Sequence, residues 1–233
     1  MPFAVDVRRG LERVAQAAGN IELAPADNQL SAVDIPMVGA TFFGVDNYRA
    51  GYMAGVALGE WIKAHWAERF DRLIVLVEPR AGALPAARIQ GQLDGLQSVI
   101  GDVPAEKQWV LNSGNTSEIS EAGMTAALRR LPDAHRVAVI CFNDDAAIGA
   151  LNAAHKTHRE QDVAIVGQGA DRRVRQELQQ PGSRIVGSTA YTPEKYGESL
   201  IPLALKILRG EPVPPAVCLE HEFISAISSD GSH

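Results

Sequence analysis

Short apolar runs alternate with amphipathic stretches along most of this chain. The run Leu73–Val77 is continuously apolar, which is typical of a strand buried on both faces of a parallel sheet. Similar runs recur downstream, and residues between them repeat their apolar positions at helical spacing. After Asp71 the pattern predicts strands at 73–77, 108–111, 137–142, 163–166 and 184–188, and helices at 86–100, 117–131, 145–155, 172–179 and 193–209. This alternation predicts a doubly wound α/β domain with a parallel sheet of at least five strands.

A long helix is expected just before these units, from Tyr48 to about Trp66. Asp46 and Asn47 precede it, and both residue types are good N-terminal caps. Three glycines, spaced four residues apart, lie on one face of this helix: Gly51, Gly55 and Gly59. Because glycine has no side chain, this face allows the backbone of a neighbouring element to approach closely.

The segment before Asp46 has too few elements for a second complete domain. Apolar positions at helical spacing predict a helix over 3–18, and short strands are expected at 21–24 and 33–38. These elements alone cannot enclose a core. The predicted organisation is a partial N-terminal lobe at 1–38, a C-terminal ligand-binding lobe at 39–192, and a last helix with its return segment at 193–233.

Composition narrows the classes of function. The chain has 233 residues with a net charge of −6, so it offers no basic surface for nucleic acid or an anionic membrane. No run is apolar enough for membrane insertion, and Met1–Ala4 lacks the features of a signal peptide. A mature exported protein would have lost its signal, so this does not decide the compartment. Cys141 and Cys218 lie in apolar stretches and are expected to be buried and unpaired.

Motifs for catalysis, metal binding and nucleotide binding are missing from the sequence. There is no Gly-x-Ser-x-Gly elbow, no P-loop, no His-x-x-x-His pair and no metal-type cysteine spacing. Gly167-Gln168-Gly169 lacks the third glycine of a dinucleotide fingerprint. The sequence therefore predicts a binding protein rather than an enzyme, with no cofactor and no metal.

Five local patterns follow one another along the chain, several at predicted strand ends. They are Pro2-Phe3-Ala4; Val33-Asp34-Ile35-Pro36 followed by Gly44-Val45-Asp46-Asn47; Pro85–Gly91 with Arg88; Cys141–Ala150 with Asn143; and Ile165–Gly169 followed by Thr189–Pro193. Together they resemble the periplasmic-binding-protein type I family, which includes ribose-type sugar-binding proteins and effector domains of lactose-repressor-type regulators. The resemblance implies a two-lobed fold. It also implies that an internal segment of the N-terminal lobe is missing between Ala32 and Val33.

The resemblance also implies a set of ligand-binding residues in a cleft between the lobes. The candidates are Phe3, Asp34, Arg88, Asn115, Asn143, Gln168 and Tyr191. Asn143, Gln168 and Tyr191 each follow an apolar run, so a parallel sheet would bring them to one carboxyl edge. The chain departs from the family pattern where Ile35 replaces a common arginine. It departs again at Gln168-Gly169, where the usual sugar-binding carboxylate is absent.

Structural interpretations of the same residues stay open at this point. Arg88 can be a solvated helix residue, and Gln168 a turn residue without contacts. Asp144 and Asp145 are interpreted as helix caps rather than ligand groups. If Arg88 and Asn143 do bind the ligand, replacing either by alanine should weaken binding by roughly 1–3 kcal/mol and leave folding nearly intact.

The function implied by the resemblance is binding of a small carbohydrate, a monosaccharide or polyol, in the interlobe cleft. The chain would then be the substrate-binding component of an ABC-type sugar transporter, periplasmic or extracytoplasmic, with the permease as its partner. The alternative is the effector-binding domain of a lactose-repressor-type transcriptional regulator in the cytoplasm. In both cases this segment itself contacts no nucleic acid and does not insert into a membrane.

Overall fold

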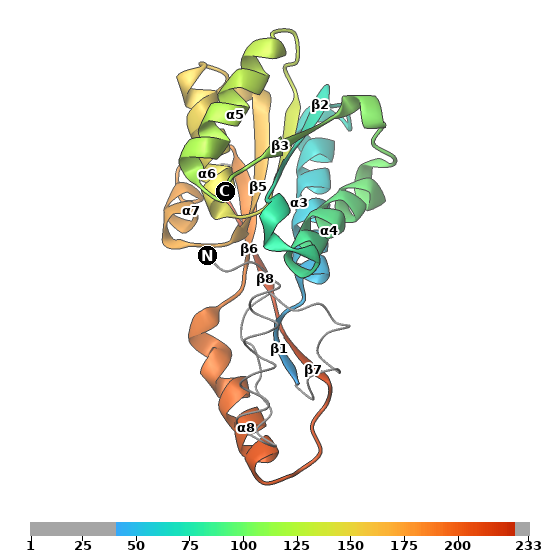
Figure 1. The fold of residues 1–233 in the computed structure, drawn as a ribbon. Coiled ribbons are helices and arrows are strands. Elements are labelled where there is room, and N and C mark those ends of the chain that lie inside the picture. Colours follow the sequence, from blue (N-terminus) through green and yellow to red (C-terminus); the bar gives the residue numbers. More distant parts are fainter. Residues whose placement is uncertain (1–40, 227–233) are drawn as a thin grey trace, which may run out of the picture. The chain divides into compact units, whose positions relative to one another are not determined.

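A computed structural model describes residues 41–226, and its larger sheet has six strands in the order β3-β2-β4-β5-β6-β8 (Figure 1). The strands are β2 (Arg72–Val77), β3 (Gln108–Asn112), β4 (Val137–Cys141), β5 (Val163–Gly169), β6 (Ile185–Ala190) and β8 (Glu222–Ser225). β2 to β6 pair in parallel, and β8 joins the edge antiparallel to β6. The predicted parallel sheet of at least five strands after Asp71 is confirmed.

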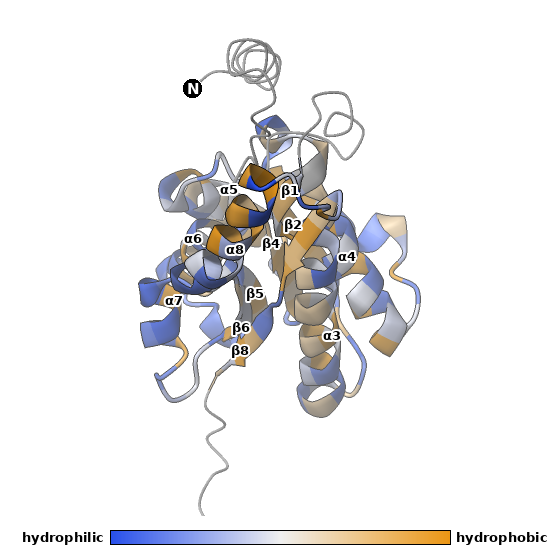
Figure 2. Cartoon of the chain, turned by 90° about the horizontal axis from the view of Figure 1, so that it is seen from below, coloured by the Kyte–Doolittle hydropathy of each residue, from blue (hydrophilic) through white to orange (hydrophobic). Residues whose placement is uncertain are grey.

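Helices cover both faces of this sheet, as the alternating pattern predicts. They are α3 (Asn47–Trp66), α4 (Ala83–Ile100), α5 (Ser117–Arg130), α6 (Asp144–Lys156) and α7 (Arg172–Glu177). Short 3₁₀ turns precede α4, β3 and β5, namely η1 (Pro79–Ala81), η2 (Ala105–Lys107) and η3 (Glu160–Asp162). In Figure 2 the strands lie between α3 and α4 on one side and α5 and α6 on the other.

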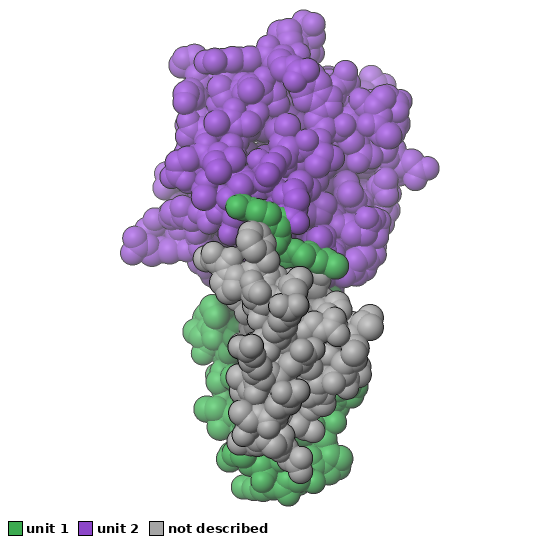
Figure 3. Space-filling view, in the orientation of Figure 1, with its two compact units in different colours: residues 1–46, 80–85, 191–221 green, residues 47–79, 86–190, 222–233 purple. Residues whose placement is uncertain are grey.

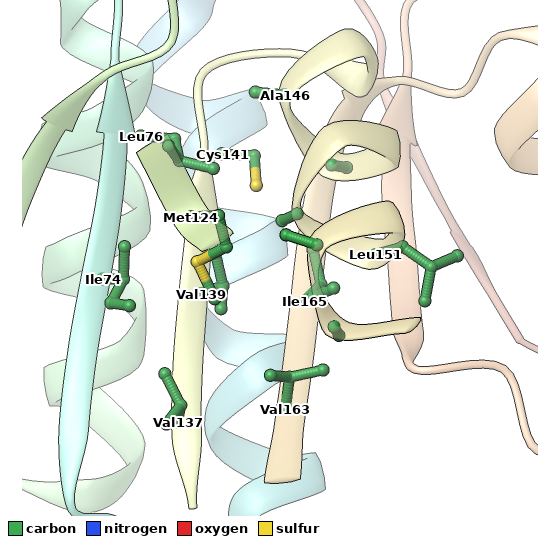
Figure 4. Close-up of a cluster of buried hydrophobic side chains, with 14 of the residues drawn as sticks. Ile74, Leu76, Met124, Val137, Val139, Cys141, Ala146, Leu151, Val163 and Ile165 are labelled. Carbon is green, nitrogen blue, oxygen red and sulfur yellow. The ribbon is translucent and has the colours of Figure 1, made fainter. Parts of the chain in front are cut away.

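The continuous apolar run of β2 is buried on both faces. Ile74 and Leu76 belong to a core cluster shared with α5 and α6, part of which Figure 4 shows. Leu73 and Val75 belong to a second cluster shared with α3 and α4. Because successive side chains of a strand point to opposite faces, a doubly covered strand needs apolar residues at every position.

α3 and α4 pack backbone to backbone through their glycines. A Cβ atom on Gly51 would lie 2.0 Å from the Arg88 carbonyl oxygen, and one on Gly55 would lie 2.1 Å from that of Gln92. α4 presents glycines in return, and a Cβ on Gly91 would lie 2.1 Å from the Tyr48 carbonyl oxygen. The close approach predicted for the glycine face is confirmed, and its partner is α4.

The chain divides into two compact units, which Figure 3 distinguishes by colour. Among the described residues, the larger contains 47–79, 86–190 and 222–226, and the smaller contains 41–46, 80–85 and 191–221. In the smaller unit β1 (Phe42–Val45) pairs in parallel with β7 (Ala216–Leu219). The sequence pattern does not predict β1, which is short and contains Gly44. The predicted lobe boundaries, 1–38, 39–192 and 193–233, stay a prediction.

The predicted helix 193–209 begins differently from the prediction. Thr192 has a left-handed φ of 45°, and a 3₁₀ turn, η4 (Pro193–Lys195), precedes α8 (Tyr196–Leu208). The ring of Tyr196 packs edge-on against Phe43, with centroids 5.9 Å apart. The first turn of α8 is therefore anchored to β1 of the same unit.

Several predictions concern other parts of the chain. Outside the described residues lie Phe3, Asp34, the helix over 3–18, the strands at 21–24 and 33–38, and the Ala32–Val33 junction.

Cys141 and Cys218 are both free, as expected, and Cys141 is buried. Cys218 is exposed, because β7 pairs with β1 and its alternate residues face outward, so its predicted burial is wrong. Within residues 41–226, no helix combines the length and apolarity that crossing a bilayer requires.

Candidate functional site

The carboxyl edge of the larger sheet gathers the buried charged side chains. Among residues 41–226 these are Glu78, Arg88 and Asp144, which are 6%, 5% and 4% exposed. Glu78 follows β2, Arg88 lies near the start of α4 after that strand, and Asp144 opens α6 after β4. Buried charged residues are rare in proteins and concentrate at functional sites. This edge is therefore the candidate site of the larger unit.

Arg88 is held by partners from two other elements. Its Nε and Nη2 donate to Asn47 Oδ1 of α3 at 3.0 and 2.5 Å, and its Nη1 donates to the Phe142 carbonyl at 3.2 Å. The guanidinium carbon lies 4.7 Å from the centroid of the Phe142 ring. The interpretation of Arg88 as a solvated helix residue is wrong, since these contacts bury it between α3, α4 and the end of β4.

Asn143 and Asn115 are in direct contact at this edge. Asn143 Nδ2 donates to Asn115 Oδ1 at 2.7 Å, while Asn143 Oδ1 caps α6 by accepting from the Ala146 N–H at 3.0 Å. Asn115 has a left-handed φ of 57°, and its N–H donates to Ser113 Oγ at 3.2 Å. The two candidate amides are thus fixed in position by backbone geometry and by each other.

Asp144 connects the start of α6 to the ends of β5 and β6. Its carboxylate accepts from Ser188 Oγ at 2.7 Å and from the Asp171 N–H at 2.6 Å. Burial raises the pKa of the Asp144 carboxyl group, and these hydrogen bonds oppose that rise. A Cβ atom on Gly167 would lie 2.5 Å from Asp144 Oδ1, so the first glycine of Gly167-Gln168-Gly169 makes room for this carboxylate.

The interpretation of Asp144 and Asp145 as helix caps is wrong. The cap of α6 is Asn143, because its side chain reaches the free N–H of the first turn. Asp145 lies one residue further and forms an ion pair with Arg173 at 2.6 Å, and Arg173 also contacts Asp171 at 2.7 Å.

Gln168 is part of β5 and is 2% exposed. Its Nε2 donates to the Ala50 carbonyl of α3 at 3.3 Å, and Thr189 Oγ1 of β6 donates to the same oxygen at 2.9 Å. β5 extends to Gly169, beyond its predicted end at Val166, because its last residues pair with β6. The interpretation of Gln168 as a turn residue without contacts is therefore wrong.

Tyr191 belongs to the smaller unit. Its ring packs edge-to-face on His221, with centroids 5.7 Å apart. The larger unit thus brings Arg88, Asn115, Asn143 and Gln168 to one edge of its sheet. Convergence of Tyr191, Phe3 and Asp34 on that edge stays a prediction.

Glu78 is a buried residue of this edge that was not among the predicted site residues. The available signal was a charged residue placed directly after the apolar run of β2. Ser188 and Thr189, polar residues within the otherwise apolar strand β6, were also not predicted. Within residues 41–226, no three histidine, cysteine or acidic side chains are grouped so that they could hold a metal ion.

Two substitutions separate the capping role of Asn143 from its amide contact. Asn143→Ala should lower the free energy of unfolding by about 1 kcal/mol, because α6 loses its cap. Asn143→Asp keeps an acceptor for the Ala146 N–H but loses the donor to Asn115 Oδ1, so the loss of about 0.5–1.5 kcal/mol expected for it reports the amide contact alone. Urea denaturation measures both values.

The matched control is Asn152→Ala, at an exposed position inside the same helix. Alanine is the better helix former there, so this variant should be at least as stable as the natural chain. Equal stability of Asn143→Ala and the natural chain would show that the cap contributes nothing.

The chain is similar to known binding proteins in sequence and in structure. A family model described as a periplasmic binding protein domain matches residues 31–212. An ABC transporter periplasmic solute binding protein from Actinobacillus succinogenes with bound D-allose has a similar structure, with a TM-score of 0.78 and 18% identity, over 96% of this chain and 75% of that one. No curated protein sequence matches the chain significantly.

Two further solved structures are similar. A glucose-galactose binding protein from Geobacillus stearothermophilus has a TM-score of 0.66 and 17% identity, over 94% of this chain and 81% of that one. A regulatory protein of the LacI family from Chloroflexus aggregans has a TM-score of 0.63 and 21% identity, over 81% of this chain and 64% of that one. At these identities the likeness establishes the fold.

Proposed function

Because the chain belongs to the family of periplasmic binding protein domains, we propose that it binds a small carbohydrate, a monosaccharide or polyol, without transforming it. The observation that carries this proposal is the concentration of buried charged and amide side chains at one edge of the sheet. Open parallel sheets bind ligands at the carboxyl ends of their strands.

The chemistry of the edge supports a ligand rich in hydroxyl groups. A sugar hydroxyl both donates and accepts, so its site needs amides, which do both, with carboxylates and guanidinium groups beside them. The edge supplies amides from Asn115, Asn143 and Gln168, a guanidinium from Arg88 and a carboxyl group from Glu78. An unmatched buried polar group costs about 1–3 kcal/mol, so such a set discriminates strongly between ligands.

We further propose that the chain is the substrate-binding component of an ABC-type sugar transporter and delivers its ligand to a permease outside the cytoplasm. The likeness to solute binding proteins with sugar ligands supports this role.

The likeness to a LacI-family regulator favours a second candidate, the effector-binding domain of a cytoplasmic transcriptional regulator. A secretory or lipoprotein signal upstream in the gene supports the first role, and a DNA-binding domain supports the second.

A thermal-shift screen with pentoses, hexoses and polyols tests sugar binding. A ligand present at about 100 times its Kd stabilises the folded state by about 2.7 kcal/mol. For a chain of this size such stabilisation raises Tm by about 5–10 °C. We expect one or a few sugars to produce this shift, with amino acids at equal concentration as the control.

Two results would overturn the proposal. The first is a screen in which no sugar raises Tm more than the amino-acid controls, followed by calorimetry without heat of binding. The second is conversion of a bound sugar to a product after long incubation, measured by chromatography, which would make the chain an enzyme.

A further inference from the structure

We propose that Asn115 is a positioning residue of this site, which fixes the plane of the Asn143 amide before a ligand arrives. This role rests on the proposed sugar binding and goes beyond it, because Asn115 then acts through Asn143 and not by a ligand contact of its own. Asn143, the side chain that it positions, lies where β4 leads into α6.

Two hydrogen bonds hold the Asn143 amide from its two ends. Its Oδ1 accepts from the Ala146 N–H at 3.0 Å, and its Nδ2 donates to Asn115 Oδ1 at 2.7 Å. The bond to Ala146 caps α6 and holds only the oxygen end, so the amide could still turn about that bond. The bond to Asn115 holds the nitrogen end. Because a hydrogen bond depends on direction, the two bonds together fix the plane of the amide.

The same pair of bonds prevents the amide from flipping. A flipped Asn143 would set its NH2 group against the Ala146 N–H and its oxygen against Asn115 Oδ1, so both hydrogen bonds would become repulsive contacts. A side-chain amide has two N–H groups and two lone pairs on its oxygen, and these contacts use one of each. The second N–H and the second lone pair of Asn143 therefore keep one fixed arrangement. A hydroxyl group, which both donates and accepts, can match it.

The loop between β3 and α5 holds Asn115 in an uncommon backbone conformation. Gly114 and Asn115 have left-handed φ values of 58° and 57°. Asn112 Oδ1 accepts from the Gly114 N–H at 2.8 Å, and Ser113 Oγ accepts from the Asn115 N–H at 3.2 Å. Asparagine tolerates left-handed backbone better than most residues that have a side chain. Residues that their surroundings hold in such conformations cluster at functional sites.

This loop is in turn anchored to the sheet and to α5. The Ser113 N–H donates to the Val77 carbonyl at the end of β2 at 2.7 Å, and Ser120 Oγ donates to the Ser113 carbonyl at 3.1 Å. Both serines are 0% exposed. The framework of the larger unit therefore holds Asn115 in place, and Asn115 holds Asn143. Such support lowers the cost of ordering a side chain when a ligand binds.

Asn115→Gly tests this role, because glycine keeps the left-handed backbone and removes the acceptor. Isothermal calorimetry on the full chain uses D-ribose, D-arabinose, D-glucose, D-galactose and glycerol as probes, together with any sugar that raises Tm in the thermal-shift screen. For the probe that binds the natural chain best, we expect Asn115→Gly to weaken binding about three- to tenfold.

A double-mutant cycle measures whether Asn115 acts through Asn143. In the Asn143→Ala background the amide is gone, so adding Asn115→Gly should change the affinity by no more than about twofold. Asn115→Asp keeps the acceptor for Asn143 Nδ2, tolerates left-handed backbone and lacks the amide donor of Asn115. It should therefore bind within about threefold of the natural chain. Circular dichroism establishes that each variant is folded.

His158→Gly is the matched control. His158 also has a left-handed φ, of 55°, and it is exposed beyond the C-terminal end of α6, at the opposite edge of the sheet. The change to glycine there should leave the affinity within about twofold of the natural chain.

The outcomes separate sugar binding from the role of Asn115. If no probe binds the natural chain, sugar binding itself fails, and the role of Asn115 fails with it. If a sugar binds and Asn115→Gly binds it as tightly as His158→Gly does, Asn115 does not position Asn143, and sugar binding stands. An equal loss for Asn115→Gly with and without Asn143→Ala would show that Asn115 acts independently of Asn143, which overturns the proposal. If Asn143→Ala binds too weakly to titrate, recovery of affinity in Asn115→Asp decides for the proposal, and a loss equal to that of Asn115→Gly decides against it.

Discussion

Gly55→Ala is expected to lower the free energy of unfolding by at least about 2 kcal/mol. The added Cβ would lie 2.1 Å from the Gln92 carbonyl oxygen and 2.8 Å from the Leu96 backbone nitrogen. These atoms belong to the α4 backbone, so they cannot move aside as a flexible side chain would. In a helix without this contact, the same substitution would stabilise by about 1 kcal/mol through helix propensity. The sign of the effect therefore reports the close packing of α3 against α4.

Gly123→Ala is the matched control for this prediction. Gly123 lies inside α5, and a Cβ there would meet no heavy atom within 4 Å. Alanine at this position should raise the free energy of unfolding by up to about 1 kcal/mol. Urea denaturation of both variants measures the contrast. If Gly55→Ala is as stable as Gly123→Ala, α3 and α4 do not pack as described.

Arg88→Ala should lower the free energy of unfolding by about 2–4 kcal/mol. The substitution leaves two buried acceptors, the Asn47 side-chain carbonyl and the Phe142 backbone carbonyl, without the donors that the guanidinium supplies. It also removes the contact between the guanidinium and the Phe142 ring. From these contacts we therefore predict a loss of stability, where the sequence alone led us to expect nearly intact folding.

Arg129→Ala provides the comparison, since Arg129 is exposed in the last turn of α5. A surface substitution of this kind should change the free energy of unfolding by no more than about 0.5 kcal/mol. Chemical denaturation at one pH and salt concentration measures both variants. A loss for Arg88→Ala as small as that for Arg129→Ala would contradict its role as a buried anchor between α3, α4 and β4.

The predictions for Arg88→Ala and Asn143→Ala express one property of the candidate site. The residues to which we assign ligand binding also hold the edge together, because Arg88 ties α3 to the end of β4 and Asn143 caps α6. Such a site is pre-organised, since its side chains are positioned before a ligand arrives. Binding studies on its variants therefore need a measurement of stability beside each affinity.

The sequence by itself determined the fold class and most elements of the larger unit. The apolar run of β2 and the helical spacing of α5 and α6 are local patterns, and the period of a pattern follows from backbone geometry within a few residues. For the same reason Asn143 could be placed at a strand end. The glycine face of α3 could also be predicted, since Gly51, Gly55 and Gly59 are only four residues apart.

Only the tertiary structure decided what the polar residues of the edge contact. Gln168 donates to Ala50, a residue 118 positions away in sequence, and Arg88 and Asp144 also find partners from distant elements. A shift in register near Ile165 and Val166 sets Ser188 opposite Gly167 and Thr189 opposite Gln168. A hydrogen bond depends on distance and direction to its partner. Those quantities exist only once the chain has folded, so local spacing predicted where these residues lie and not which groups they bind.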